Sequence, residues 1–348
     1  MQRIQFTAFD VHAHMTNVCV KPLATSKPRR WEVPTSIPSL RKVLEQIPRP
    51  IHLTFEEGPM AGWLYRNLRE CVDELLVNDP RRNGLVVNDG DATDDIDAEK
   101  LCDLYRGGFL RQVHHPEDER RAVFKELVSL YHKQVVGRVK QANRIIGHVK
   151  QWGCVWREKD FADDLRRDEL VGSLGQTDCG SLRRVQLNLL WDNYDTAVRS
   201  EMAMYREMVK AVKEDEFAVR LMELPGIAEV RAATWVAYLD TPWRFKSKQA
   251  LWKYLGIGLT RSQSGRSCDF VHVEQYCNHL LRGMILGAAQ SAITKGDNPF
   301  KNQYDRWLKT GLTFHQARRN AARSMAAVGW GMWKNGGVYD PQRVGENP

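Results

Sequence analysis

Acidic residues crowd into one short segment of a basic chain. The stretch DATDDIDAEKL, from Asp91 to Leu101, holds five acids in eleven residues. If the segment is helical, Asp94 and Asp97 lie on one face, with Cβ atoms about 5–6 Å apart. Carboxylates this close repel each other unless a cation lies between them. The alternative is a solvated helix start, where acids suit the positive end of the helix dipole.

Two more acids come at the ends of strand-like segments. Asp10 ends an apolar run in FTAFDVH, and Glu56 ends another in LTFEEG. A charge in an apolar strand needs a reason, because burying it unpaired is costly. Acids on a first strand, on a later strand end and paired on a following helix form the ribonuclease-H-like arrangement.

Four such carboxylates could hold one or two Mg²⁺ (or Mn²⁺) ions, which prefer oxygen ligands and stabilise in-line attack at phosphorus. The predicted metal ligands are Asp10, Glu56, Asp94 and Asp97. The rival ligands are Glu57, Asp91 and Asp95. Strand alternation and the helical face favour the first set.

The elements that position these acids follow from residue patterns in the first third of the chain. Strand-like runs with turn signals alternate with helical segments, which predicts a mixed α/β sheet domain at 1–115. We expect polar turns after the second strand. The expected strands are 4–10, 15–20, 51–56 and 74–80, and the expected helices are 37–46, 62–71 and 91–108, the last closed by Gly107 and Gly108.

Long helices are expected in the segment 116–216. Phe124, Leu127, Tyr131 and Val135 follow the i, i+3, i+4 spacing of an amphipathic stripe. A second long helix is expected at 182–212. The pair predicts an antiparallel hairpin, or coiled coil, with its turn region near 171–180, that bridges domains or pairs with another subunit. A plain helical layer on one core is the alternative.

The segment 217–348 is expected to be mostly helical. Its LPGIAEVRAATWVAYL stretch resembles a helix-hairpin-helix turn, in which backbone N–H groups near Gly226 could hold a phosphate. Pro-Gly turns are common, so this motif is weak evidence by itself. On residue types alone, SQSGRS at 262–267 reads as a polar loop without catalytic function.

Charge is distributed unevenly along the 348 residues, whose net charge is +8. Residues 1–110 hold 14 Lys and Arg against 16 Asp and Glu, whereas residues 217–348 hold 18 against 9. This asymmetry predicts one part that holds metal and another that binds a polyanion. A generically basic surface is the alternative.

The remaining composition excludes several classes of protein. No run approaches the ~20 apolar residues of a membrane span, and the first residues lack the apolar core of a signal peptide, so we expect a cytoplasmic protein. The seven cysteines form no CxxC pair, which argues against a disulfide framework. The spacing of Cys268, His272, Cys277 and His279 fits no common structural zinc pattern.

Three motifs together resemble the DEDD (Piv-like) insertion-sequence transposases. FDVH, FEEGPMAGWLYRNL and TDDIDAEKL match that family's D-x-[AS/H], Y-E-A-G-P-x-G-Y-x-L-Y-R and K-T-D-x-x-D-A motifs. The resemblance places the family's metal-binding acids on Asp10, Glu56, Asp94 and Asp97. Ala92 stands where the family usually has Lys.

The last third is similar to the second domain of the same family. LPGI, WRFKSKQALWKYLGIGLTRSQSG and CNHLLRG occur in the family's order, with Cys277 in place of a usual Gly. The resemblance implies that Ser264 is a nucleophile, with Ser262 and Ser267 as close competitors. A serine attacking phosphorus needs charge neutralisation, which bound metal and Arg261 and Arg266 could supply. Arg282 and Gly226 are further expected nucleic-acid contacts.

The resemblance also implies a reaction and partners. These are the bridge-RNA-guided serine recombinases, with a RuvC-like domain and a serine domain from different subunits of a homo-oligomer, a dimer that assembles to a tetramer on DNA. The expected partners are double-stranded donor and target DNA and a non-coding guide RNA, which would read the sequence by pairing. The alternatives are a site-specific DNA invertase of the same family, a Holliday-junction-type nuclease using only the four acids, and a non-catalytic RNA-binding protein.

Overall fold

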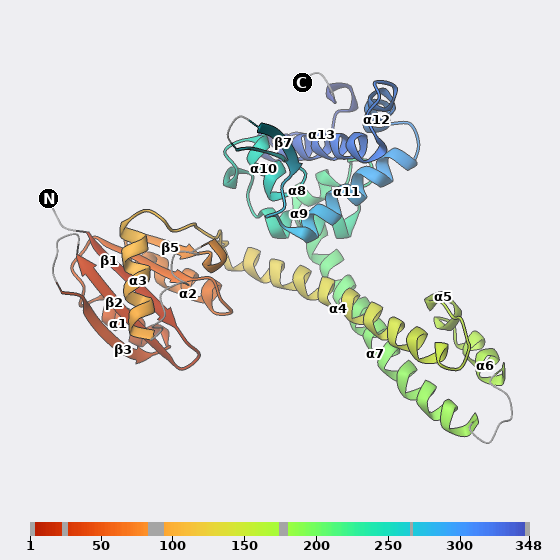
Figure 1. The fold of residues 1–348 in the computed structure, drawn as a ribbon, viewed down its shortest axis with the longest axis horizontal. Helices are drawn as coiled ribbons and strands as arrows, with labels where there is room; N and C mark the ends of the chain where they lie inside the picture. Colours follow the sequence, from red (N-terminus) through yellow and green to blue (C-terminus); the bar gives the residue numbers. More distant parts are fainter. Residues whose placement is uncertain (1–3, 23–26, 83–93, 174–179, 265–266, 345–348) are drawn as a thin grey trace. The chain divides into compact units, whose positions relative to one another are not determined.

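The computed structural model describes residues 4–22, 27–82, 94–173, 180–264 and 267–344, drawn as helices and strands in Figure 1. The chain divides into two compact units, Met1–Ala122 and Val123–Pro348. The division into three segments expected from the sequence stays a prediction. Each unit is described by itself below.

A five-stranded mixed sheet forms the centre of the N-terminal unit, with strand order β3-β2-β1-β4-β5. The first three strands pair antiparallel, whereas β4 pairs parallel with both β1 and β5. This arrangement confirms the predicted mixed sheet. The strands are β1 (Gln5–Val11), β2 (Met15–Pro22), β3 (Arg29–Pro34), β4 (Ile51–Glu56) and β5 (Glu74–Asn78).

Helices cover both faces of this sheet. On one face, Phe9 of β1 and Phe55 of β4 are buried with apolar residues of α1 and α2. On the other, Phe6 and Ala8 of β1 are buried with residues of α3. The helical elements of this unit are α1 (Ile37–Leu44), α2 (Ala61–Leu68), η1 (Arg69–Cys71), η2 (Pro80–Arg82) and α3 (Asp94–Arg106).

Strand β3 was not expected, because its sequence RRWEVP was read as part of a polar turn region. It lies at the edge of the sheet and pairs only with β2. Its residues are exposed or half-buried, without a single buried side chain. Charged edge strands of this kind lack the apolar alternation by which a strand is recognised in a sequence.

Two long antiparallel helices open the second unit, as predicted. They are α4 (Glu119–Lys150) and α7 (Gly180–Lys213). Ile145 of α4 and Leu187 and Trp191 of α7 are buried in one cluster at the end of the hairpin. The short helices α5 (Glu158–Phe161) and α6 (Asp164–Ser173) lie between them in the chain and were not expected.

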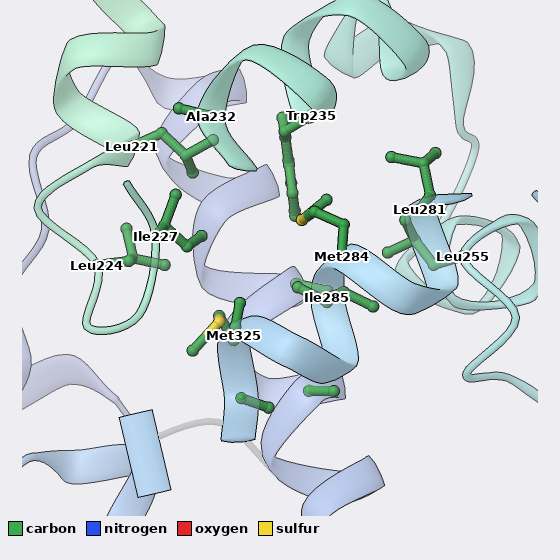
Figure 2. Close-up of a cluster of buried hydrophobic side chains, with 14 of the residues drawn as sticks. Leu221, Leu224, Ile227, Ala232, Trp235, Leu255, Leu281, Met284, Ile285 and Met325 are labelled. Atoms are coloured by element: carbon green, nitrogen blue, oxygen red, sulfur yellow. The ribbon is translucent and has the colours of Figure 1, made fainter. Parts of the chain in front are cut away.

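The C-terminal part of the second unit is a helical bundle around Trp235, which is fully buried. Figure 2 shows Trp235 with Met284 and Ile285 among the side chains of this core. The turn between α8 and α9 contains the LPGI segment, where a helix-hairpin-helix-like motif was expected, and that motif assignment stays a prediction. The elements are α8 (Glu216–Leu221), α9 (Glu229–Leu239), η3 (Pro242–Arg244), α10 (Lys248–Tyr254), β6 (Leu259–Ser264), β7 (Ser267–Val273), α11 (His279–Thr294), α12 (Pro299–Lys309), α13 (Phe314–Asn335) and η4 (Pro341–Arg343).

The β6–β7 hairpin differs from the expected polar loop. The two strands pair antiparallel from Leu259 opposite Val273 to Ser264 opposite Ser267, with an irregularity after Gln263. The Thr260 hydroxyl lies 2.9 Å from a Glu274 carboxylate oxygen, to which it donates at the base of the hairpin. A polar two-stranded ribbon on a helical bundle has no apolar periodicity that would predict it.

Membrane insertion has no support from the helices. Within the part of the chain that the structure describes, none of them combines the length and the apolar character that a membrane span needs.

Candidate active site

Asp10 and Glu56 occupy neighbouring positions at the same edge of the sheet. Strands β1 and β4 are parallel, and Phe9 lies opposite Phe55 in their register. Asp10 and Glu56 are the next residue on each strand. Adjacent strands lie about 4.8 Å apart, so the register brings two acids separated by 46 positions in sequence to adjoining strand ends.

Both acids lie on the face of the sheet that α3 covers. Side chains alternate along a strand, so Asp10 shares a face with Phe6 and Ala8, which are buried with α3. Glu56 likewise shares a face with His52, whose ring lies 5.7 Å from the Phe6 ring. Asp10 is half-buried and Glu56 is exposed. A solvent-accessible pair of this kind can meet a large polyanionic substrate.

The direction of α3 brings its first turn toward the same edge. Its last turn lies over the strand beginnings, where the Tyr105 ring is 5.6 Å from the Phe6 ring and its hydroxyl donates to Glu74 at 2.9 Å. The first turn therefore lies toward the strand ends (Figure 1). Asp97 is half-buried there, one turn before Leu101, which is itself buried against the sheet.

Several predicted acids cannot be placed. Asp91 lies outside the described residues. Asp94 and Asp95 belong to the first turn of α3, and their side chains lie outside the described part of the chain.

The rival ligand Glu57 has a different partner. Its carboxylate lies 2.6 Å from His115 Nε2, and the His115 ring in turn lies 5.7 Å from the Tyr65 ring of α2. That contact is on the α2 side of the sheet, whereas Glu56 shares the α3 side with Asp10. Glu57 is therefore engaged on the other face, and the choice of Glu56 over Glu57 as a metal ligand stays a prediction.

His12 is a part of the site that the residue pattern did not single out. Its Nε2 lies 3.1 Å from Asp10 Oδ2, just beyond the end of β1. A neighbouring imidazole orients a carboxylate and, when protonated, competes with a cation for it. The sequence could have identified His12, because in the motif FDVH it comes two residues after Asp10. That spacing puts two side chains on the same side of an extended chain.

The residues at this edge fit a divalent cation by donor chemistry. Carboxylate oxygens from two strand ends and one helix are the ligands that Mg²⁺ prefers. Among the described side chains, no three His, Cys, Asp or Glu residues converge closely enough to hold a metal ion. Asp10, Glu56 and Asp97 are all described, so the structure brings these three toward one edge of the sheet but not close enough together to share an ion, and the side chain of Asp94 lies outside the described residues.

Ion pairs fix α3 against the outer strands. Lys21 of β2 donates to Glu99 at 2.7 Å and to Asp103 at 2.6 Å, and Arg30 of β3 also pairs with Glu99. The hydrogen bond from Lys21, followed by that from Arg30, outweighs burial and lowers the pKa of Glu99. These contacts hold the helix that carries Asp97.

The predicted nucleophile lies in the second unit, at the tip of the β6–β7 hairpin. Ser264 is the last residue of β6, opposite Ser267 at the start of β7. The side chains of Ser262, Ser264 and Ser267 lie outside the described part of the chain, as does Arg266 entirely. Arg261 is exposed on β6.

Arginines from two helices, α11 and α13, lie near one another in the second unit. Gly256 has a positive φ of 66°, and a Cβ there would come within 2.9 Å of Arg282 Cδ on α11. Burial together with the charges of Arg282 and Arg318 lowers the pKa of Arg319 on α13. Sequence reasoning named Arg282 but missed Arg318 and Arg319. The sequence could have identified them, because in HQARRNAARS the arginines alternate with small residues that are buried in the structure.

Gly226 has a packing role. Its φ is +84°, and a Cβ would come within 2.3 Å of the Ala288 carbonyl oxygen on α11. Arg231 donates to the Gly226 carbonyl and, at 3.0 Å, to Ser291. The turn is therefore fixed against α11, while a contact between Gly226 and nucleic acid stays a prediction.

Part of the second unit, which contains the β6–β7 hairpin, matches a known protein family. Residues 218–305 match the model of the Transposase IS116/IS110/IS902 family. The matched segment runs from α8 into α12 and includes both strands of the hairpin. The predicted nucleophile and Arg282 therefore lie within the part of the chain that is similar to insertion-element transposases.

Two relatives agree with the family match. The uncharacterized 44.8 kDa protein of insertion element IS116 from Streptomyces clavuligerus is 26% identical over 136 residues, or 39% of this chain. The match spans 34% of that protein, about a third of its length. The y4pF/y4sB protein of Sinorhizobium fredii, which carries a transposase name, is 22% identical over 94% of this chain and 82% of its own length.

Proposed function

We propose that the protein is the transposase of an insertion sequence, an enzyme that cuts DNA strands and joins them to new partners. The match of residues 218–305 to a transposase family carries the proposal. The y4pF/y4sB protein, which carries a transposase name, aligns over 94% of the chain. This coverage supports assigning the same function to both units.

The acidic edge of the sheet is proposed as the metal-binding half of the catalytic machinery. Asp10, Glu56, Asp94 and Asp97 would hold Mg²⁺ (or Mn²⁺), which supplies Lewis-acid stabilisation of negative charge on a scissile phosphate. His12 holds the Asp10 carboxylate in position through its 3.1 Å contact. The adjoining ends of β1 and β4, with α3 across them, support this assignment.

Ser264 is proposed as the nucleophile. Its Oγ attacks phosphorus, an O–P bond forms as the bond to one deoxyribose oxygen breaks, and the serine proton passes to that leaving oxygen through solvent or a nearby base. A hydroxyl of a second strand then reverses the step and releases the serine. The number of phosphodiester bonds is conserved, so no external energy source is needed. Arg261, Arg266 and Arg282 would neutralise the charge on the phosphate.

A covalent protein–DNA adduct tests this assignment. The full chain is incubated with nicked element-end DNA, and adducts are detected by denaturing gel and peptide mass spectrometry. Wild type is expected to yield an adduct at Ser264, and Ser264→Ala to yield none while still binding DNA. Ser262→Ala is the matched control on the same strand and should retain the adduct. Adducts that persist in Ser264→Ala would rule this serine out.

The proposed partners are donor and target double-stranded DNA and a non-coding guide RNA. A net positive charge on residues 217–348, with 18 Lys and Arg against 9 Asp and Glu, supports sequence-independent contact with a nucleic-acid backbone. Homo-oligomers would bring the acidic unit of one subunit to the hairpin of another. Ribonuclease treatment of the purified complex is expected to abolish strand joining. Undiminished joining by RNA-free protein would refute the proposal that an RNA guides the reaction.

A further inference from the structure

A cavity of about 760 Å³ opens in the helical bundle of the second unit. It lies between α10, α12, α13 and η4, and its volume is that of a site for a small organic ligand. Its described lining includes Trp252, Trp307 and Trp330 together with Lys248, Arg306 and Arg323. No described residue of the proposed metal site or of the β6–β7 hairpin lines it.

The charge of the cavity is positive. Lys248, Arg306, Arg323 and Arg343 line it, and among the described lining residues there is no Asp or Glu. Asp340 pairs with Arg343 at 3.2 Å from outside this lining. Arg306 is exposed at the mouth. The charge therefore suits an anionic group held near the opening.

Hydrogen bonds fix two of the three indole rings. Trp252 Nε1 donates to the Arg323 carbonyl oxygen at 3.1 Å, and Trp330 Nε1 donates to the Pro242 carbonyl oxygen at 2.8 Å. Lys334 Nζ lies 3.9 Å from the centre of the Trp330 ring. Lys248 Nζ likewise lies 5.9 Å from the centre of the Trp252 ring. The third ring of the lining, Trp307, is therefore the aromatic surface considered for a planar ligand.

Two buried polar atoms of the lining have no hydrogen-bond partner. They are Nη2 of Arg323 and Oε1 of Gln303. The rest of the Arg323 guanidinium is held, since Nε donates to Ile257 at 2.6 Å and Nη1 to Asn320 at 2.9 Å. Both atoms are shielded from solvent, so Arg323 contributes its charge to the wall of the cavity, and neither atom is counted as a contact to a ligand.

We propose that this cavity binds one unpaired nucleotide of a nucleic acid. The base would stack on the Trp307 ring, and its phosphate would lie by Arg306 and Arg343. A base within a duplex cannot enter such a cavity without leaving the stack, so the site would select unpaired segments. The source of the nucleotide, DNA or RNA, rests on the proposed function, whereas the site itself is distinct from the catalytic one.

Binding by the full chain without divalent ions tests the proposal. Fluorescence anisotropy compares labelled mixed-sequence single-stranded DNA, single-stranded RNA and a duplex of equal length. Trp307→Leu is expected to weaken binding of at least one single strand about tenfold, with little effect on the duplex. Trp307→Phe should bind like wild type, and Trp243→Leu, an exposed tryptophan outside the cavity, is the matched control.

The salt dependence of binding tests the proposed contact between the phosphate and Arg306. Arg306→Ala is expected to reduce the salt dependence of single-strand binding by about 0.7 in the logarithmic slope. Lys309→Ala, an exposed cation on the same helix that does not line the cavity, should affect single strands and duplex alike.

Three outcomes would overturn the proposal. They are wild-type binding by folded Trp307→Leu, an equal loss for duplex and single strands, and binding of free AMP or dAMP as tight as that of the oligonucleotides. Each variant's melting temperature is measured beside its affinity. Because no cleavage is required, absent strand transfer would refute the proposed function and leave this result standing.

Discussion

At the scale of the residue, a single position at the end of β4 separates the proposed ligand Glu56 from Glu57, which contacts another part of the chain. Glu56 lies on the face of the sheet that α3 covers, beside Asp10, while Glu57 contacts His115 at 2.6 Å. The two acids are adjacent in sequence and alternate in direction. Substitution of an acid on the α3 face should therefore lower metal-dependent activity, whereas substitution of Glu57 should lower stability.

Asp10→Asn is expected to lower Mg²⁺-dependent strand joining by more than about 100-fold, because an amide is a neutral and weaker ligand. Its melting temperature should change little, since Asp10 is only half-buried. Glu57→Gln is the matched control and should lower the melting temperature while leaving the metal dependence unchanged. Loss of stability without loss of joining in Asp10→Asn would make this acid structural.

At the scale of the element, α3 owes its position to ion pairs as well as to apolar packing. Glu99 accepts from Lys21 and Arg30, which lowers its pKa below the ordinary value of 4.5. A carboxyl with a lowered pKa in the folded state stabilises that state above its ordinary pKa. This contribution is lost as the pH falls through the lower, folded-state pKa.

Glu99→Gln is therefore expected to lower the free energy of unfolding by up to about 1 kcal/mol at pH 7, since the pair is partly exposed. The difference from wild type should shrink as the pH falls below 4.5 and vanish in stronger acid. Urea unfolding across this range measures it. A difference that is the same at every pH would mean that the substitution acts through packing.

The turn between α8 and α9 supplies a second prediction at this scale. Gly226→Ala combines a positive φ of +84° with a Cβ within 2.3 Å of the Ala288 carbonyl. We expect a loss of about 2–4 kcal/mol. Gly296→Ala also has a positive φ, +73°, but meets no atom within 4 Å, so it should cost only about 1 kcal/mol. Equal losses would show that the contact with α11 is unimportant.

At the scale of the whole molecule, the sequence predicted the elements with strong periodicity. The strand Ile51–Glu56 was found at its observed bounds, and both long helices were found within a few residues. Strand β3, helices α5 and α6 and the β6–β7 hairpin were not, because their charged or polar residues carry little apolar repeat. Alternation along a strand favoured Glu56 over Glu57, whereas the parallel register that sets Asp10 beside Glu56 is known only from the structure. The contact between Glu57 and His115 depends on folding over 58 positions, which local patterns do not encode.

The central claim is that one chain carries out strand cutting and joining on an insertion sequence. The most direct measurement supplies the purified protein, with any RNA that it retains, with a plasmid bearing the element's flanks and a target plasmid. New junctions are then sequenced. The account predicts junctions between element ends and target that require Mg²⁺ and Ser264. Hydrolysed ends without junctions, or junctions that persist in Ser264→Ala, would contradict it.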